Sequence, residues 1–181
     1  MEKSRAILIR RYRLTETSLI VHWCSPELGL FKTVAKGALR PKSGFAGKLD
    51  LFFAAEIEFV RSRSSDLHIL KELEVLDPRF GLRASYVQTL AASYFVQLLE
   101  IVVEKDTPIP EIHDLLERAL DHVAKERPSL RSVTYFEQEL VQHLGIGQPL
   151  LPPHGAIRQL HHKLPSQREE LIELLGGGSA V

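Results

Sequence analysis

"LIVHWCSPELGLFKTVA", residues 19–35, contains two short apolar runs separated by a turn sequence. The runs 19–23 and 30–35 are rich in β-branched and aromatic residues, which favour strands. Between them, Pro26 has the φ angle that the second position of a type I turn requires, and Gly29 suits the fourth position. The segment therefore predicts two successive strands with no helix between them.

Three further strands are expected on either side of this segment. One precedes it and two follow, at residues 6–12, 51–60 and 67–76. The second half of 51–60 alternates apolar and acidic residues, as a half-buried strand does, whereas the period of 67–76 also fits a helix. Five short strands without intervening helices are typical of a small barrel or sandwich, so the first part of the chain predicts one of these two folds.

After Pro78 the hydrophobic pattern changes from strands to helices. The predicted helices are 84–103, 109–126, 128–145 and 166–175, with a linker at 148–155. The first of them begins with sixteen uncharged residues, so we expect it to be the central helix, buried on nearly every side. The predicted fold class is therefore α+β. A β domain at 1–78 precedes an α-helical domain at 79–181, which ends in the linker, the short helix and a frayed tail at 176–181.

Positive charge is concentrated at the start of a chain that is neutral as a whole. Residues 1–50 hold ten Lys and Arg against four Asp and Glu, and the remainder is acidic by the same margin. Such asymmetry suggests a basic domain that meets a polyanion, joined to a domain with another task. The alternative is a solvated surface without a ligand.

The densest basic segment is the loop 36–48, which contains no acid. It is not a nucleotide-binding Walker A loop, because Lys42 stands where the first glycine is required and Leu49 follows Gly47-Lys48 in place of a hydroxyl. A flexible basic loop can instead follow a phosphate backbone, with an affinity that falls steeply with salt. In a five-stranded barrel of the OB type, the loops after strands one and four flank the oligonucleotide face. The candidate DNA-binding residues are therefore Arg10, Arg11, Arg13, Lys36, Arg40, Lys42, Lys48, Arg61 and Arg63.

Three aromatic residues near this loop could stack on bases: Trp23, Phe31 and Phe45. Strand aromatics usually pack inward, so the core is the favoured place for Trp23 and Phe31. Phe45 lies in the loop, and both interpretations stay open for it.

The single cysteine, Cys24, excludes an internal disulfide and a thiolate zinc cage, which fits a reducing compartment. A buried, inert thiol is its expected state. The N-terminus lacks the apolar stretch of a signal peptide, and the longest uncharged stretch is too short to span a bilayer. We therefore expect a soluble, cytosolic protein that meets no membrane.

No catalytic or metal site is expected, and no cofactor. His154, His161 and His162 lie near the linker, but a structural zinc ion needs four converging ligands. His113-Asp114 resembles a phosphohydrolase pair, but the further metal ligands are not evident. A solvated helix face is therefore favoured over a hydrolase, which would show metal-dependent turnover of a phosphoester.

Two separated segments resemble one protein family. "RRYRLTETSLIVHWCSPELGLFKTVAKGALRPKS", residues 10–43, resembles the N-terminal region of the bacterial recombination mediator RecO through Glu16-Thr17-Ser18, Ser25–Gly29 and Ala35–Arg40. "YFEQELVQHLGIGQPL", residues 135–150, is similar to the family's F-E-x-x-L-L-x-x-L-G-[YF]-x-P-x-L segment. The matching positions are Phe136, Glu137, Leu140, Leu144, Gly145 and Leu150. The two segments occur in the order in which the family has them.

The resemblance implies an N-terminal OB-fold followed by a helical domain in a cytoplasmic, nucleoid-associated bacterial protein. It implies DNA repair and homologous recombination, through binding of single- and double-stranded DNA and annealing of complementary strands without nucleotide hydrolysis. It also implies RecR as a partner, with the tail of single-stranded-DNA-binding protein (SSB) and RecF as further ones, in the loading of RecA. Lys36, Arg40 and Lys42 fall on the family's basic loop after strand three.

The chain departs from the family pattern in two places. Many members carry a four-cysteine zinc module after the second segment, whereas "LPPHGAIRQLHH" stands here, and the family's later C-terminal part is largely missing. Relatives that hold the acidic SSB tail commonly have basic residues just before the Phe-Glu pair. Here Val133, Thr134 and Tyr135 are neutral, and Arg131 is the nearest cation.

A rival hypothesis is a protein–protein adaptor whose barrel binds a replication or repair protein instead of DNA. The acidic residues of the later strands, Glu56, Glu58, Glu72 and Glu74, are consistent with it. An adaptor of this kind would not bind single-stranded DNA even at low salt.

Overall fold

The computed structural model describes residues 1–176, so the predicted fraying of the tail lies outside the described residues from residue 177 onward. The chain forms two compact units. Unit 1 contains Met1–Arg79 together with Glu104–His113, and unit 2 contains Phe80–Val103 and the chain from Asp114 onward. The domain boundary placed at residue 78 stays a prediction.

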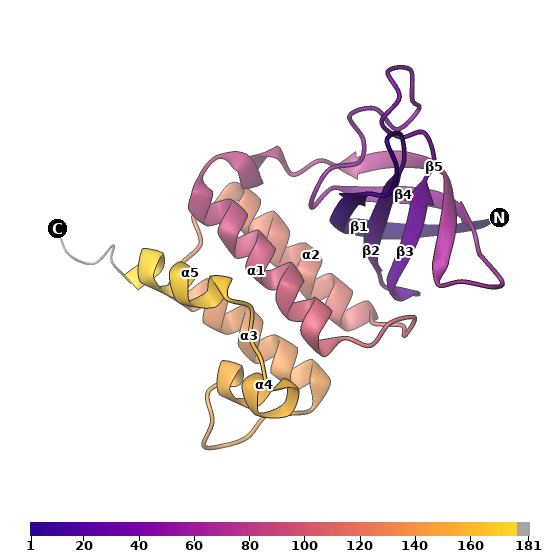
Figure 1. The fold of residues 1–181 in the computed structure, drawn as a ribbon. Coiled ribbons are helices and arrows are strands. Elements are labelled where there is room, and N and C mark those ends of the chain that lie inside the picture. Colours follow the sequence, from indigo (N-terminus) through magenta and orange to yellow (C-terminus); the bar gives the residue numbers. More distant parts are fainter. Residues whose placement is uncertain (177–181) are drawn as a thin grey trace. The chain divides into compact units, whose positions relative to one another are not determined.

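Unit 1 is a closed five-stranded β-barrel (Figure 1). The strands are β1 (Glu2–Arg13), β2 (Leu19–Ser25), β3 (Gly29–Ala35), β4 (Ala54–Val60) and β5 (Leu67–Asp77). Their order around the barrel is β1-β2-β3-β5-β4, and β1 closes the barrel by pairing with both β2 and β4. All pairs are antiparallel except β3 with β5. The predicted α+β class and the five-stranded barrel of OB order are confirmed, and the ambiguous last segment is a strand.

Alternating side chains of the strands fill the barrel. On β2 the inward residues Leu19, Val21 and Trp23 belong to one buried cluster with residues of the other strands. Trp23 is fully buried and its indole Nε1 donates a hydrogen bond to Thr33 Oγ1 at 2.8 Å, which satisfies the only polar atom of the ring. Phe31 is also buried, so the predicted core position of both aromatics is confirmed.

The turn between β2 and β3 is held by a segment from much later in the chain. Ile109 N donates to Pro26 O at 2.9 Å, and Asp106 N donates to Leu30 O at 3.3 Å. Gly29 has φ +66°, and a Cβ atom at this position would lie 2.1 Å from the carbonyl oxygen of Thr107. Glycine is therefore required here both by the left-handed backbone and by the close approach of the later segment.

The remaining elements are helical. After the 3₁₀ turn η1 (Phe80–Arg83), they are α1 (Tyr86–Val102), α2 (Pro110–Lys125), α3 (Leu130–Leu144), α4 (Pro153–His161) and α5 (Gln167–Gly176). α1 is buried over most of its length, as its uncharged sequence predicts. α3 begins at a capping box between Ser129 and Ser132 and ends at Gly145 in the left-handed conformation. In unit 2, α5 lies against α1 and α4 lies against α3.

α4 was not predicted, because it begins inside the segment expected to be a linker. Its first residue, Pro153, follows another proline, and such a pair indicates a loop. Proline is nevertheless tolerated in a first helical turn, where the backbone N–H has no partner within the helix. Among the described residues, no helix has the length and apolarity needed to cross a membrane.

Candidate nucleic-acid interface

The basic loop between β3 and β4 folds into successive turns, whereas its flexibility stays a prediction. Five hydrogen bonds from residue i+3 to residue i run through it, from Ala38 N→Ala35 O to Lys48 N→Phe45 O. Ala38 and Leu49 are buried in the barrel core, and Phe45 is half-buried against that core. These three side chains anchor the loop at the mouth of the barrel, so Phe45 serves packing in this structure.

The basic loop and the turn between β1 and β2 are joined at one end of the barrel. Leu39 N donates to Thr17 O at 2.9 Å, and Gly37 N donates to Ser18 Oγ at 3.3 Å. From β1, the Arg11 guanidinium donates to Leu49 O at 2.5 Å and lies 3.1 Å from Asp50 Oδ1. The structure therefore brings the loop and the end of β1 together, as the candidate site requires.

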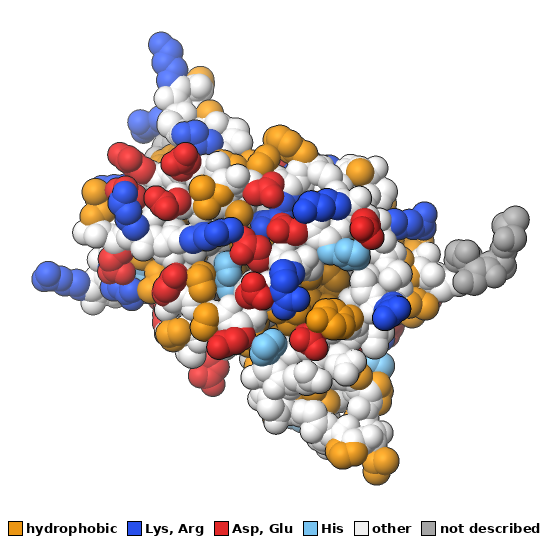
Figure 2. Space-filling view, turned by 180° about the vertical axis from the view of Figure 1, so that it is seen from behind, with side chains coloured by type: hydrophobic (Ala, Val, Ile, Leu, Met, Phe, Trp, Pro, Cys, Tyr) orange, Lys and Arg blue, Asp and Glu red, His pale blue; other side chains and the backbone are white. Residues whose placement is uncertain are grey.

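Five candidate cations at this end are exposed and carry no ion pair or side-chain hydrogen bond within residues 1–176. They are Arg13, Lys36, Arg40, Lys42 and Lys48. Figure 2 shows blue Lys and Arg side chains on the loop that projects from the barrel, with red Asp and Glu side chains gathered below it. Because no acid among the described residues pairs with these cations, they are available to an external polyanion.

A β-bulge in β1 decides which way the arginines at its end point. The pairing Leu8↔Trp23 is followed by Arg10↔His22, so Ile9 is an extra residue and the inward–outward alternation changes phase there. Arg10 and His22 lie on the outer side of the barrel with Lys32, which pairs with His22. Lys32 was not among the candidate cations, because a lone lysine within an apolar strand gives no signal of its own, and its ammonium lies 3.8 Å from Asp66 Oδ2.

Arg61 and Arg63 lie apart from the other candidate residues. Arg61 donates to both carboxylate oxygens of Glu2, at 2.8 and 2.9 Å, and these hydrogen bonds lower the pKa of Glu2. Glu2 is at the start of β1, whereas Arg13 is at its end, roughly 35 Å away along an extended strand. The structure therefore does not bring the loop after β4 to the basic end of the barrel.

The outer side of β4 and β5 is acidic. Glu56 lies opposite Glu74 and Glu58 lies opposite Glu72, which places like charges on directly paired residues. On the other side of β4, Lys3 Nζ contacts Glu58 Oε1 at 2.5 Å and Arg5 is the strand partner of Glu56, so two cations of β1 compensate part of this charge. The four glutamates of the adaptor hypothesis thus form one acidic wall, separate from the basic end.

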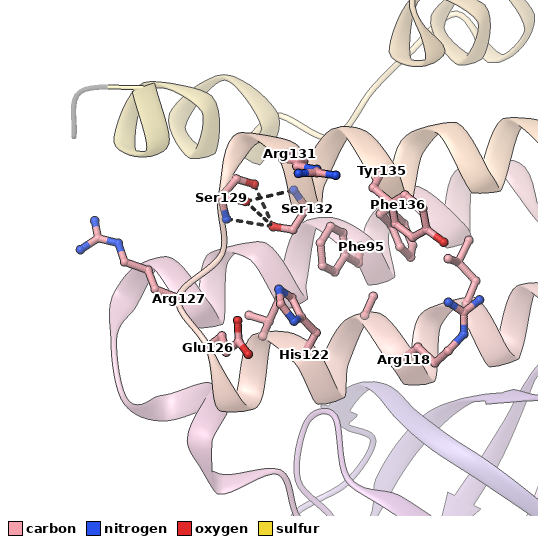
Figure 3. A pocket seen from close by; sticks show the side chains of 13 residues that line it. Phe95, Arg118, His122, Glu126, Arg127, Ser129, Arg131, Ser132, Tyr135 and Phe136 are labelled. Atoms are coloured by element: carbon pink, nitrogen blue, oxygen red, sulfur yellow. Dashed lines mark hydrogen bonds between the residues drawn. The ribbon is translucent and has the colours of Figure 1, made fainter. Parts of the chain in front are cut away.

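Unit 2 contains an apolar pocket of about 540 Å³ between α2 and α3. Phe95 and Phe136 stack at 4.2 Å between ring centroids on its floor, with Leu115 beside them. Figure 3 shows Arg118 and Arg131 on two sides of this floor, whereas Arg127 extends away from it. The pocket therefore combines an apolar floor with a cationic rim.

Sequence reasoning had found only Arg131 near this site. Arg118 lies on a different helix, and its guanidinium pairs with Asp114 at 2.8 Å on the helix surface. Asp114 is thus engaged in an ordinary i,i+4 pair on the helix surface, as expected. His113 is buried, so the solvated helix face predicted for the His113-Asp114 pair is wrong for the histidine.

Glu137 is a fully buried carboxylate that accepts hydrogen bonds from two side chains. Tyr94 Oη donates to it at 2.5 Å, and Arg168 donates to its two oxygens at 2.8 and 3.2 Å. Arg168 also lies 2.9 Å from His154 Nδ1. Burial and the neighbouring Arg168 lower the pKa of His154, and burial and Glu137 raise that of Tyr94. His154 therefore belongs to this network. Among residues 1–176, no group of three or more His, Cys, Asp and Glu is placed to hold a metal.

Both the N-terminal and the C-terminal part of the chain match known proteins. Residues 1–79 match the family model "Recombination protein O N terminal", and residues 83–150 match "Recombination protein O C terminal". The DNA repair protein RecO of Idiomarina loihiensis is 31% identical over 144 residues, which are 78% of this chain. The chain belongs to the RecO family.

Other RecO proteins match over similar lengths. The RecO of Rhodopirellula baltica is 29% identical over 77% of this chain, and that of Salinibacter ruber is 28% identical over 97%. The matched regions are 52% of the Rhodopirellula protein, 59% of the Idiomarina protein and 65% of the Salinibacter protein. The chain thus spans little more than half the length of the first two RecO relatives.

Proposed function

We propose that this chain binds single- and double-stranded DNA at the basic end of its barrel and promotes the annealing of complementary strands. One observation carries the proposal: the exposed, unpaired Lys36, Arg40, Lys42 and Lys48 project from a loop that the barrel core holds in place. A fixed loop presents these charges together, and phosphates that bind to them release their counterions. Family membership supports DNA as the polyanion.

Annealing by this route needs no bond-making chemistry, so we propose a recombination mediator that is not an enzyme. Two DNA strands repel each other, and cations placed between them offset the repulsion while base pairing proceeds. Arg10, Arg11 and Arg13 extend the positive surface along the end of β1. Arg61 and Arg63 are left out of the proposed surface, because Glu2 binds Arg61 at the other end of β1.

Replacing the four loop cations with alanine tests the proposal. Contact with about four phosphates gives the parent chain a log–log salt slope near −3 on a single strand, taking roughly −0.7 per phosphate. The quadruple variant Lys36→Ala, Arg40→Ala, Lys42→Ala, Lys48→Ala is expected to bind more weakly and with a clearly shallower slope, because only the arginines of β1 remain to contact phosphates. Fluorescence anisotropy of a labelled oligonucleotide across a salt series measures both quantities.

A matched variant controls for net charge. Lys71, Lys105, Lys125 and Lys163 are also exposed and have no ion pair or side-chain hydrogen bond in the described part of the chain, but none of them belongs to the loop. Changing these four to alanine removes the same charge and should leave the slope of the parent largely intact. Equal losses of DNA affinity and of salt slope in the two quadruple variants would refute a localised DNA surface. Absence of binding by the parent at low salt would favour the adaptor.

We further propose that the pocket of unit 2 binds an acidic peptide with an apolar side chain, for which the SSB tail is the candidate. The apolar floor of Phe95 and Phe136 suits the apolar side chain, and Arg118 and Arg131 suit the carboxylates. Assembly with RecR and RecF in the loading of RecA belongs to the same proposal, on the basis of family membership alone.

If the pocket binds an acidic peptide, reversing the charge of its two rim arginines should lower the affinity for that peptide. Arg118→Glu with Arg131→Glu is expected to weaken binding of a labelled acidic peptide at least about tenfold, because two charge-assisted contacts become repulsive. Arg158→Glu, a reversal on the exposed surface of α4, is the control and should bind as the parent does. Unchanged binding by the double variant would exclude the pocket.

A further inference from the structure

Tyr12 is turned to the outside of the barrel by the β-bulge at Ile9. Leu8, before the bulge, is fully buried in the barrel core opposite Trp23. Regular alternation would place Arg10 and Tyr12 on the same inner side as Leu8. The extra residue reverses the phase, so that Tyr12 pairs with Ile20 on the outer side and is 44% exposed. Bulges are commonly found where a strand must redirect a side chain.

The exposed ring lies beside a histidine and two cations, one of which, Lys32, is paired with Asp66. Its edge packs on His22, with ring centroids 5.4 Å apart and planes at 69°. Arg10 lies two residues earlier on the same outer side, and Lys32 lies beside His22 on β3. A ring whose orientation is already fixed loses little conformational freedom when a ligand contacts it.

The other aromatic side chains of the barrel are not available to a ligand in this way. Trp23, Phe31 and Phe59 are buried in the core, and Phe45 is half-buried against it. Among the described aromatic residues of unit 1, Tyr12 is the only exposed one. A base that contacts this end of the barrel therefore meets one aromatic surface.

We propose that Tyr12 is a base-stacking contact that gives the barrel a preference for single-stranded over duplex DNA. The proposal rests on the DNA-binding function above and adds a contact to the base where that function invokes phosphates. An aromatic ring stacks on any base, but only an unpaired base presents its face. Tyr12 thus contributes to affinity without dependence on sequence or salt, whereas the lysines and arginines contribute to both forms of DNA.

Tyr12→Leu in the full chain tests the proposal, because leucine keeps an apolar side chain at this position but removes the ring. Affinity for a single-stranded oligonucleotide is expected to fall at least about fivefold, the lower end of the size of one lost stacking contact. Affinity for a duplex should stay within about twofold of the parent, with an unchanged salt slope, since the phosphate contacts remain. Tyr12→Phe should bind both forms as the parent does.

A second variant reports the contact directly and does not depend on the leucine variant folding well. In Tyr12→Trp the new indole is exposed, whereas the native Trp23 is buried and supplies a constant background. A normal oligonucleotide should quench the new emission, and an abasic oligonucleotide of the same length should bind without quenching it.

The outcomes separate this inference from the proposed function. If Tyr12→Leu binds both forms as the parent does while the loop variant binds weakly, the stacking contact is wrong and the DNA surface stands. Equal losses on single-stranded and duplex DNA, or equal quenching by normal and abasic oligonucleotides, would also overturn the stacking contact. If the parent binds no DNA, both proposals fail together.

Discussion

Cys24 lies within the buried part of β2, and burial raises the pKa of its thiol to about 12. The thiolate is the reactive form, so almost none is present at neutral pH. We expect a thiol-specific reagent to modify the native chain only as fast as it unfolds. The chain has one cysteine, so the labelling rate, measured across a denaturant series, reports that opening directly. Rapid, complete labelling without denaturant would show that the thiol is accessible in the native state.

The charge of single residues is visible in the sequence, but the direction and the partners of their side chains are not. The cations of the loop 36–48 are visible in the sequence because they are dense and lack acidic neighbours, and the structure leaves them unpaired in the described chain. The direction of Tyr12 is not visible, because one extra residue at Ile9 reverses the alternation of β1. Arg61 looked equivalent to the loop cations, but its partner Glu2 is 59 residues away in sequence and only the barrel closure brings them together.

The segment containing α5 is attached to α1 and α3 through the buried ion pair of Arg168 and Glu137. Arg168→Ala would leave the Glu137 carboxylate buried with the Tyr94 hydroxyl as its remaining donor. Loss of one partner of a buried pair typically costs about 3–5 kcal/mol, so the free energy of unfolding should fall by roughly that amount. Urea unfolding followed by circular dichroism measures it. A loss below about 0.5 kcal/mol, the usual size for a surface site, would mean that the pair does not hold the helices.

Acid should weaken the same network. The pKa of His154 is lowered in the folded chain by burial and by Arg168, against an opposing effect of Glu137. The neutral imidazole is therefore favoured by folding. Its contribution to stability is complete above the unfolded pKa of about 6.5 and is lost as the pH falls through the folded value. His154→Gln should make the free energy of unfolding depend less on pH in this range; an unchanged pH profile would exclude the histidine.

The sequence predicts the strands and helices more completely than the contacts between them. Strand periodicity and helical spacing identified all five strands and four of the five α-helices, because each of these has a clear hydrophobic pattern. The double proline concealed α4. The contact of Thr107 and Ile109 with the β2–β3 turn could not be foreseen, because it joins positions about eighty residues apart and its only local sign is Gly29.

Across the whole chain, the neutral net charge conceals separate charged surfaces. Within the barrel, the basic loop is at one end, and the paired glutamates of β4 and β5 form an acidic wall. On the proposed function, the basic end would attract DNA and the acidic wall would repel it, so we expect DNA to be confined to the loop and the end of β1. In unit 2, the rim of the pocket contains Arg118 and Arg131, which we propose as the contacts of an acidic peptide.

The central claim is the location of the DNA surface, and chemical-shift mapping tests it most directly. A short single-stranded oligonucleotide is titrated at low salt into the ¹⁵N-labelled full chain, and the perturbed backbone amides are assigned. The account predicts perturbations at residues 10–13 and 36–50, with none at Glu56, Glu58, Glu72 or Glu74. Perturbations centred on those glutamates or on the helices of unit 2, or an unperturbed spectrum, would contradict it.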